Sequence, residues 1–304
     1  MIVAVGCKFG SFSLLAKSEE FDVGHEQTLV HVDIDFEMIG KNVPVDLGVV
    51  ADAKLFADAI FDFLPDAFEG NLGDWRAYLE GRRTEHDVMI RDAMEEGDCP
   101  INALPQAKVI DVIEQILPDE AMVGIDGGQV AMWANTLLTP HDRLSAVYTP
   151  GTGHLGSGFP MAMGFALAHP DRPSVLVTGD GAFAFTAQDL ATCHKYNIPV
   201  ISVVLHDACW GIYNRFKGVF NNERWGSELS DVDFCKVAEG YGVSAVRIST
   251  LEQLADELQK ALASGKPAVI EVPVMYQLNP VNKYLGPATM PDVRLGQAMM
   301  ALTD

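Results

Sequence analysis

Apolar residues beyond position 104 gather in short runs, and the longer segments between them repeat their apolar positions every three or four residues. Short runs are typical of buried strands, and the longer repeat is typical of amphipathic helices. The runs predict strands at 122–125, 146–148, 174–178, 200–205, 245–248 and 268–272. The clearest helices are expected at 107–116, 233–241 and 251–262. Because strands alternate with helices, the pattern predicts a doubly wound α/β fold, a parallel sheet with helices on both faces.

The first 64 residues show the same alternation with fewer elements. Strands are predicted at 2–5, 29–35 and 49–50, followed by a helix from 53 to about 64 with Asp52 as its N-cap. Three strands are half of a doubly wound, Rossmann-like unit. The first strand is expected to be buried although it starts at the first residue, and no partner for Val3 is evident. We therefore expect this domain to be partial.

Two further segments complete the organisation. Residues 65–103 are polar and charged and are expected to form a helical linker. Residues 276–304 contain three prolines and are predicted to be an irregular tail with a short last helix. The expected organisation is a partial domain at 1–64, a linker at 65–103, a second domain at 104–275 and a tail at 276–304.

The amino-acid composition argues against several classes of protein. The formal charge of −21 argues against nucleic-acid binding, because phosphate backbones are held by clustered Lys and Arg. Apolar residues make up 48% of the chain, which excludes wholesale disorder. Five cysteines without a CxxC pair argue against a disulfide scaffold or a zinc ribbon and favour a reducing compartment. With no apolar run of ~18 residues and no basic N-terminal segment, a cytoplasmic protein without membrane contact is expected.

Glycine clusters follow three of the predicted strands, at 126–129, 151–156 and 179–182. In parallel sheets, ligands bind beyond the carboxyl ends of the strands. Glycines at a strand-to-helix turn let backbone N–H groups approach a phosphate, and the N-terminus of the next helix favours its negative charge. An acidic chain can therefore still hold a diphosphate at this edge.

Asp180 lies between Gly179 and Gly181, after the strand at 174–178. A lone Gly-Asp-Gly is equally well explained as a helix N-cap. However, Asp207 follows the next strand, and adjacent parallel strands lie ~5 Å apart, so the two carboxylates are expected to converge. Converging oxygens beside a phosphate-binding turn are typical of a Mg²⁺–diphosphate site.

At this point the sequence resembles a known family. Residues 179–181, then a helix and a strand, then a polar pair and Trp210-Gly211 resemble the thiamine diphosphate (ThDP) motif of acetolactate synthase and pyruvate oxidase-type enzymes. Residues 126–134 and 153–160 resemble successive blocks of that family's diphosphate-binding domain, and 30–42 resemble the second half of its central domain. The resemblance implies that 104–275 is the ThDP-binding domain.

The resemblance also implies roles for individual residues. Mg²⁺ would be bound by the carboxylates of Asp180 and Asp207 and by the main-chain carbonyl of Cys209. The Gly153 carbonyl would hold the 4′-amino group of ThDP, and Leu155 would bend the cofactor. The full cofactor-binding set is Gly128, Gln129, Gly153, His154, Leu155, Gly179, Asp180, Gly181, Ala182, Asp207, Cys209, Trp210, Gly211 and Ile212. Flavin adenine dinucleotide (FAD) stays open as a second cofactor, but no motif here supports it.

Several positions depart from the family pattern. His206-Asp207 replaces the usual Asn-Asn, which should tighten Mg²⁺ binding but repel the diphosphate. Tyr213 stands where pyruvate decarboxylases carry a catalytic glutamate, and Phe216 stands near the substrate-selecting tryptophan of acetolactate synthases. The family's pyrimidine-binding domain, with its glutamate, is not in this sequence, and Glu26 lies in the wrong segment to replace it. No catalytic residue is therefore identified in this chain.

The sequence thus predicts the ThDP- and Mg²⁺-binding part of an acetolactate synthase-like carboligase or decarboxylase, a transferase or lyase acting on 2-oxo acids. Family active sites form between subunits, so a homo-oligomer (dimer or tetramer), a separate pyrimidine-domain subunit, or both are expected. Two alternatives stay open. One is acyl transfer of the sulfoacetaldehyde acetyltransferase type, and the other is a truncated, non-catalytic subunit that binds ThDP or serves a structural role.

Overall fold

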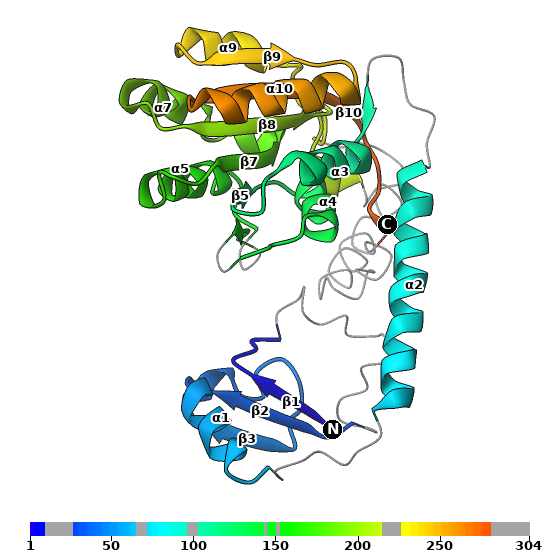
Figure 1. The fold of residues 1–304 in the computed structure, drawn as a ribbon. Helices are drawn as coiled ribbons and strands as arrows, with labels where there is room; N and C mark the ends of the chain where they lie inside the picture. Colours follow the sequence, from blue (N-terminus) through cyan, green and yellow to red (C-terminus); the bar gives the residue numbers. More distant parts are fainter. Residues whose placement is uncertain are drawn as a thin grey trace, which may run out of the picture. The chain divides into compact units, whose positions relative to one another are not determined.

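The computed structural model describes residues 1–9, 27–64, 72–95, 103–142, 145–149, 153–214 and 226–280. The chain divides into two compact units, one containing Met1–His86 and the other Asp87–Asn279. Each unit has its own parallel sheet (Figure 1). No helix among the described residues has the length and apolarity that a bilayer span requires.

The first unit contains a three-stranded parallel sheet with the order β1-β2-β3. Its elements are β1 (Ile2–Val5), β2 (Leu29–Asp33), the 3₁₀ helix η1 (Phe36–Met38), β3 (Leu47–Val50) and α1 (Ala53–Phe61). One face of the sheet packs on Phe9 and Val43. As expected, Asp52 caps α1, because its side chain accepts the Lys54 and Leu55 N–H groups.

Three predictions for this unit need correction. Val3 does have a partner, Val30 of β2, and β1 is not buried, because it lies at the edge of the sheet with Val3 and Val5 44% and 42% exposed. The strand predicted at 29–35 ends at Asp33, because the side chains of Asp33 and Asp35 accept backbone N–H groups that turn the chain into η1.

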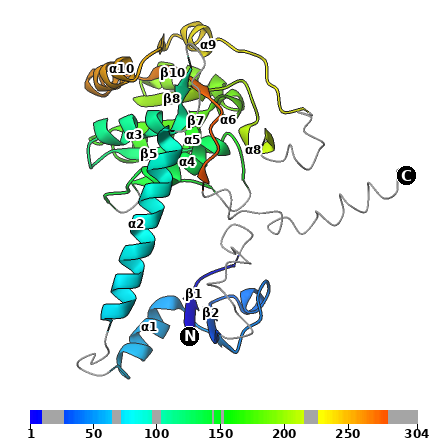
Figure 2. The ribbon, with the colours of Figure 1, turned by 90° about the vertical axis from the view of Figure 1, so that its right-hand side faces the viewer.

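Helix α2 (Gly73–Glu95) occupies most of the segment predicted to be a helical linker. Figure 2 shows it as one long helix. It is polar on most of its surface, and its buried residues are Ile90 and Ala93, near its C-terminal end. Its exposed side chains include the apolar residues Trp75, Leu79 and Val88, and the role of this segment as a linker stays a prediction.

The second unit is built on a seven-stranded parallel sheet. The path runs β4-β10-β8-β7-β5-β6, and β9 also pairs with β10. The strands are β4 (Leu104–Pro105), β5 (Met122–Ile125), β6 (Ala146–Val147), β7 (Ser174–Gly179), β8 (Val200–His206), β9 (Ser244–Arg247) and β10 (Ala268–Met275). Every residue of β8 is buried, as expected for a central strand covered on both faces.

Helices cover both faces of this sheet, which confirms the predicted fold class (Figures 1 and 2). On one face lie α3 (Gln106–Ile116), α4 (Gln129–Leu137) and α10 (Leu251–Ser264), with α3 packed against the other two. On the other face, α5 (Gly158–Ala168), α7 (Leu190–Tyr196) and α9 (Phe234–Gly240) share one apolar core with Leu176, Val200, Val204 and Val269. Three short helices lie in the connections: α6 (Asp180–Ala184), the 3₁₀ helix η2 (Ala187–Asp189) and α8 (Gly211–Asn214).

Candidate functional site

Two carboxylates meet where β7 and β8 end. The strands pair in parallel with Gly179 opposite Leu205, so Asp180 and Asp207 follow their strands at the same edge of the sheet. The Asp180 carboxylate is buried, and it accepts the N–H of Gly181 at 2.6 Å and the N–H of Ala208 at 2.7 Å. The second bond reaches the residue next to Asp207. The structure thus brings the two predicted metal-binding carboxylates together.

The pair carries negative charge that its surroundings do not fully neutralise. Burial, and then the neighbouring charge of Asp180, raises the pKa of Asp207 to about 7. Burial also raises the pKa of Asp180, although the Gly181 hydrogen bond and His206 oppose the change. Within the part of the chain that the structure describes, neither carboxylate forms an ion pair with a lysine or an arginine. Two buried carboxylates at one point fit a hard divalent cation such as Mg²⁺.

A buried histidine links this pair to the interior of the sheet. His206 Nδ1 donates to Glu271 Oε1 of β10 at 2.7 Å, and His206 Nε2 lies 3.7 Å from Asp180 Oδ2 and 3.5 Å from Asp231 Oδ1. Burial lowers the pKa of His206, but the hydrogen bond to Glu271 and the three carboxylate charges outweigh it, and the net direction is upward. These contacts favour the protonated form of the ring, which lies beside the Asp180 carboxylate. Sequence reasoning missed Glu271, which looks like an ordinary strand residue.

The loop after β8 has an unusual backbone. Ala208 has φ of +52°, a left-handed conformation that costs a residue with a Cβ about 1–2 kcal/mol. The loop is held by two backbone bonds, from Leu229 N–H to the Ala208 carbonyl at 2.8 Å and from Trp210 N–H to the Ser227 carbonyl at 2.7 Å. Cys209 forms an isolated antiparallel bridge with Glu228. Strain held in place by surrounding bonds is typical of functional loops.

Close backbone approaches bring most of the other predicted cofactor residues to this edge. A Cβ on Gly181 would lie 2.6 Å from the Trp210 ring, one on Gly128 would lie 3.2 Å from Ile212 Cβ, and one on Gly211 would lie 3.0 Å from Gln129 Cβ. Gly127, with φ of +105°, lies against Gly179 N and Ala182 Cβ. The glycine loops after β5, β7 and β8 therefore pack closely around one small region.

Asp126 connects this region to the start of α5. The buried Asp126 carboxylate accepts the N–H groups of Gly127 and Gly158, both at 2.7 Å, and thereby ties the loop after β5 to the start of α5. In the loop ahead of α5, Gly153 and His154 are exposed and Leu155 is half-buried. Within the described part of the chain, these three residues form no hydrogen bond or ion pair with Asp180 or Asp207. Asp126 is the first residue of the glycine cluster predicted at 126–129, but the sequence indicated no role for it.

Two glutamines support the site. Gln106, at the first position of α3, is buried, and its Nε2 donates to Asp207 Oδ2 at 3.3 Å. Gln129, a predicted cofactor contact, is buried, and its Nε2 donates to the Gln277 carbonyl at 2.8 Å. Gln106 and Gln277 lie far from the motif in sequence, and no local signal could have found them.

A cavity of about 260 Å³ opens beside the carboxylate pair. Asp180 and Gly181 form one wall, and the apolar side chains of Phe185, Trp210 and Phe234 line the rest. Largely apolar walls with one charged corner are typical of small-molecule sites.

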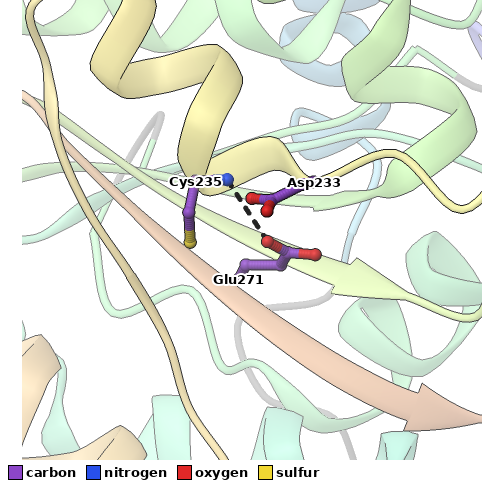
Figure 3. A group of neighbouring side chains, drawn as sticks. All are labelled: Asp233, Cys235 and Glu271. Atoms are coloured by element: carbon purple, nitrogen blue, oxygen red, sulfur yellow. Dashed lines mark hydrogen bonds between the residues drawn. The ribbon is translucent and has the colours of Figure 1, made fainter.

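A second group of potential metal ligands lies nearby, formed by Asp233, Cys235 and Glu271 (Figure 3). Their ligand atoms lie within 4.8 Å of one another, but each has another role. Asp233 caps α9 by accepting Lys236 N–H at 2.9 Å, and Glu271 accepts Cys235 N–H at 3.3 Å. Burial, together with Glu271, raises the pKa of the Cys235 thiol to about 12, so the sulfur is a poor ligand at neutral pH. This group is explained as the cap of α9.

Comparison with known protein families identifies the family to which this chain belongs. The family description "Thiamine pyrophosphate enzyme, C-terminal TPP binding domain" matches residues 126–272, and "Thiamine pyrophosphate enzyme, central domain" matches residues 1–60. Thiamine pyrophosphate (TPP) is another name for thiamine diphosphate. The chain belongs to the thiamine pyrophosphate enzyme family, as its motifs indicated.

Several curated proteins are similar to this chain in sequence. The chain is 30% identical to the probable acetolactate synthase large subunit of Methanocaldococcus jannaschii, over 90% of this chain and 46% of the relative. It is 28% identical to the sulfoacetaldehyde acetyltransferase of Castellaniella defragrans (90% and 49%) and 32% identical to the pyruvate oxidase of Lactiplantibacillus plantarum (80% and 40%). The chain spans about half the length of the curated relatives that it matches.

A solved structure shares the fold. The thiamine diphosphate-dependent 4-hydroxybenzoylformate decarboxylase of Rhodococcus jostii RHA1 superposes with a TM-score of 0.69 at 24% identity, over 90% of this chain and 49% of that chain.

Phe216, Glu26 and the tail beyond Pro280 lie outside the described residues, so the predictions made for them stay predictions.

Proposed function

We propose that the second unit binds ThDP together with Mg²⁺ at the ends of β5, β7 and β8, within the domain assigned to residues 104–275. Asp180, Asp207 and the Cys209 carbonyl hold the metal, and the glycine loops at 127–129, 179–182 and 211–212 hold the diphosphate. Gly153, His154 and Leu155 contact the organic part of the cofactor. The observation that carries this proposal is the pair of buried carboxylates beside closely packed glycine loops.

The chemistry of this site follows from its charges. Two carboxylates, unpaired with lysine or arginine in the described part of the chain, attract a divalent cation, and the bound cation then offsets the repulsion between Asp207 and a diphosphate. The hydrogen bond to Glu271 raises the pKa of His206, and the ring opposes the rise in the pKa of Asp180 that burial causes. When bound, ThDP supplies the electron sink that 2-oxo acid decarboxylation requires.

We further propose that this chain is the cofactor-holding part of an acetolactate synthase-like carboligase or decarboxylase that acts on 2-oxo acids. The family match and the similarity to acetolactate synthase large subunits support this substrate class. The chain spans about half of these relatives, and turnover in this proposal requires a pyrimidine-binding domain in addition to the residues described here. An oligomer, as a dimer or tetramer, is part of this proposal.

Calorimetry on the 304-residue chain tests the cofactor site. Titration with ThDP in the presence of Mg²⁺ should release or absorb heat at one site per chain, and Asp180→Ala should abolish it. Asp256→Ala removes an exposed carboxylate from α10 of the same unit and should bind as the unchanged chain does. Absence of binding at millimolar cofactor, or equal binding by Asp180→Ala, would contradict the proposed site.

A second candidate function is acyl transfer to phosphate, of the sulfoacetaldehyde acetyltransferase type. His206 beside the metal-binding position, followed by Trp210-Gly211, favours it, as does the similarity to the Castellaniella defragrans protein. Assays with a supplied pyrimidine-domain chain distinguish the two functions. Phosphate-dependent consumption of sulfoacetaldehyde would support acyl transfer, and phosphate-independent consumption of pyruvate would support the first proposal.

A further inference from the structure

The side-chain amide of Gln106 is buried with only one of its two polar atoms satisfied. Gln106 is the first residue of α3 and is 1% exposed. Its Nε2 donates to Asp207 Oδ2 at 3.3 Å, whereas its Oε1 has no hydrogen-bond partner among the residues that the structure describes. A buried acceptor without a donor costs about 1–3 kcal/mol, so nearly all such groups in proteins are paired. The Oε1 atom is therefore available to a bound ligand.

The sheet of the second unit fixes this amide at the same edge as the two carboxylates. Strand β4, which leads directly into α3, pairs in parallel with the end of β10, and β10 pairs in turn with β8. The first turn of α3 is also held, because Ala107 N–H donates to Gln277 Oε1 at 3.0 Å. Ligands of parallel sheets bind beyond the carboxyl ends of the strands, and Gln106 reaches Asp207 there from a rigid position.

Asp207 also determines how the Gln106 amide is oriented. An ionised carboxylate only accepts hydrogen bonds, and of the two polar amide atoms only the nitrogen donates them. With the amide reversed, Oε1 would face the carboxylate and two acceptors would repel each other. The oxygen and nitrogen of an amide are about 2.2 Å apart, so Gln106 Oε1 lies within about 5.5 Å of Asp207 Oδ2. The unpaired oxygen is thus next to a carboxylate that the proposed function assigns to Mg²⁺.

The hydration of Mg²⁺ supplies a donor of the kind that this oxygen lacks. Mg²⁺ loses its waters reluctantly and usually keeps several of them in a protein site. The cation polarises such a water, which makes the water a strong hydrogen-bond donor. We propose that Gln106 is a positioning residue of the metal site: its Nε2 holds Asp207, and its Oε1 accepts a hydrogen bond from a water bound to the cation. This inference rests on the function proposed above, which assigns the cation to Asp180 and Asp207.

Calorimetric titration of Mg²⁺ into the full chain at pH 7, with and without ThDP, tests this role. Gln106→Met keeps the length of the side chain and removes both polar atoms. It should weaken Mg²⁺ binding by about 10-fold or more, as replacing a group that supports metal ligands typically does. The urea midpoint of the metal-free chain should change little, because the variant also removes the unsatisfied acceptor. A residue with only a structural role would show the reverse, namely a lower midpoint and an unchanged affinity for Mg²⁺.

Two further variants serve as controls. Gln115→Met makes the same change at an exposed position of α3, where Gln115 Nε2 donates to Asp111 Oδ2 at 2.8 Å, and it should leave the affinity for Mg²⁺ unchanged. Gln106→Glu keeps an oxygen acceptor and should bind Mg²⁺ at least as tightly as the original chain does. It therefore tests the role of the acceptor even if Gln106→Met does not fold.

The outcomes separate this inference from the proposed function. If Gln106→Met binds Mg²⁺ as the original chain does while Asp180→Ala does not bind it, the role of Gln106 is wrong and the metal site stands. Weaker binding of Mg²⁺ by Gln106→Glu than by the original chain would also overturn the role of the acceptor. If the original chain binds no Mg²⁺ with or without ThDP, both the inference and the proposed site are wrong.

Discussion

Replacing Asp207 with asparagine should stabilise the metal-free chain at alkaline pH and weaken its response to Mg²⁺. The asparagine keeps the shape of the side chain and its contact with Gln106 while removing one of two adjacent charges. Asp207 has its pKa raised from 3.8 to about 7. A raised carboxyl pKa means that the folded state holds the proton more tightly than the unfolded state does. Folding is therefore destabilised above pH 7, and this destabilisation disappears as the pH falls toward 4.

The magnitude follows from the size of the pKa shift. A shift of about 3 units corresponds to about 4 kcal/mol when the group is fully ionised. By the linkage relation, the free energy of unfolding of the variant relative to the original chain should change by about 3 kcal/mol between pH 5 and pH 8. Because Asp180 and Asp207 titrate as a coupled pair, this value is an upper bound.

Urea unfolding of both proteins at pH 5 and pH 8, with and without about 5 mM Mg²⁺, measures this difference in stability. Without Mg²⁺, the variant should gain stability relative to the original chain as the pH rises. With Mg²⁺, the original chain should recover more stability than the variant, because it offers the cation a second carboxylate. If the stability difference is the same at both pH values, or if Mg²⁺ stabilises both proteins equally, the inferred carboxylate pair is wrong.

Three further predictions concern the surroundings of the pair. Gly181→Ala places a Cβ 2.6 Å from the Trp210 ring, so it should shift tryptophan fluorescence and destabilise the chain by about 1–3 kcal/mol in urea unfolding. An unchanged fluorescence spectrum would contradict the close approach of Gly181 and Trp210. Glu271→Gln removes the buried carboxylate that is hydrogen-bonded to His206 and should cost about 3–5 kcal/mol, measured by the same unfolding assay. A loss below about 1 kcal/mol would contradict a charged pair. The Cys235 thiol, with its pKa raised to about 12, should resist iodoacetamide at pH 8 in the folded chain and react after unfolding, as mass spectrometry of the peptide would show.

Much of the fold could be predicted because its signals are local. The apolar runs of β7 and β8 identify themselves as buried strands, and the glycines after them mark the turns at which a ligand binds. Asp180 and Asp207 could be paired in advance because parallel strands that follow one another are usually neighbours in the sheet. The least accurate predictions concerned strand ends, where side chains such as Asp33 and Asp35 redirect the backbone.

The parts that escaped prediction depend on contacts between distant residues. Glu271 binds His206 across 65 positions of sequence, and Gln106 reaches Asp207 across 101. Each of these side chains is polar and unremarkable in its own segment. Their importance comes from burial, because a charge or amide removed from water must find its partner within the fold.

The sequence by itself determined the alternation of strands and helices, the three glycine loops and the family, since these depend on residues close together along the chain. Only the tertiary structure decided that the pKa of His206 is raised, that the pKa of Asp207 is raised to about 7, and that β1 is an exposed edge and not a buried strand. The physical reason is the same in each case. The local pattern of apolar and polar residues indicates which residues avoid water. The charge state and exposure of a group depend instead on the distant residues that the fold brings next to it.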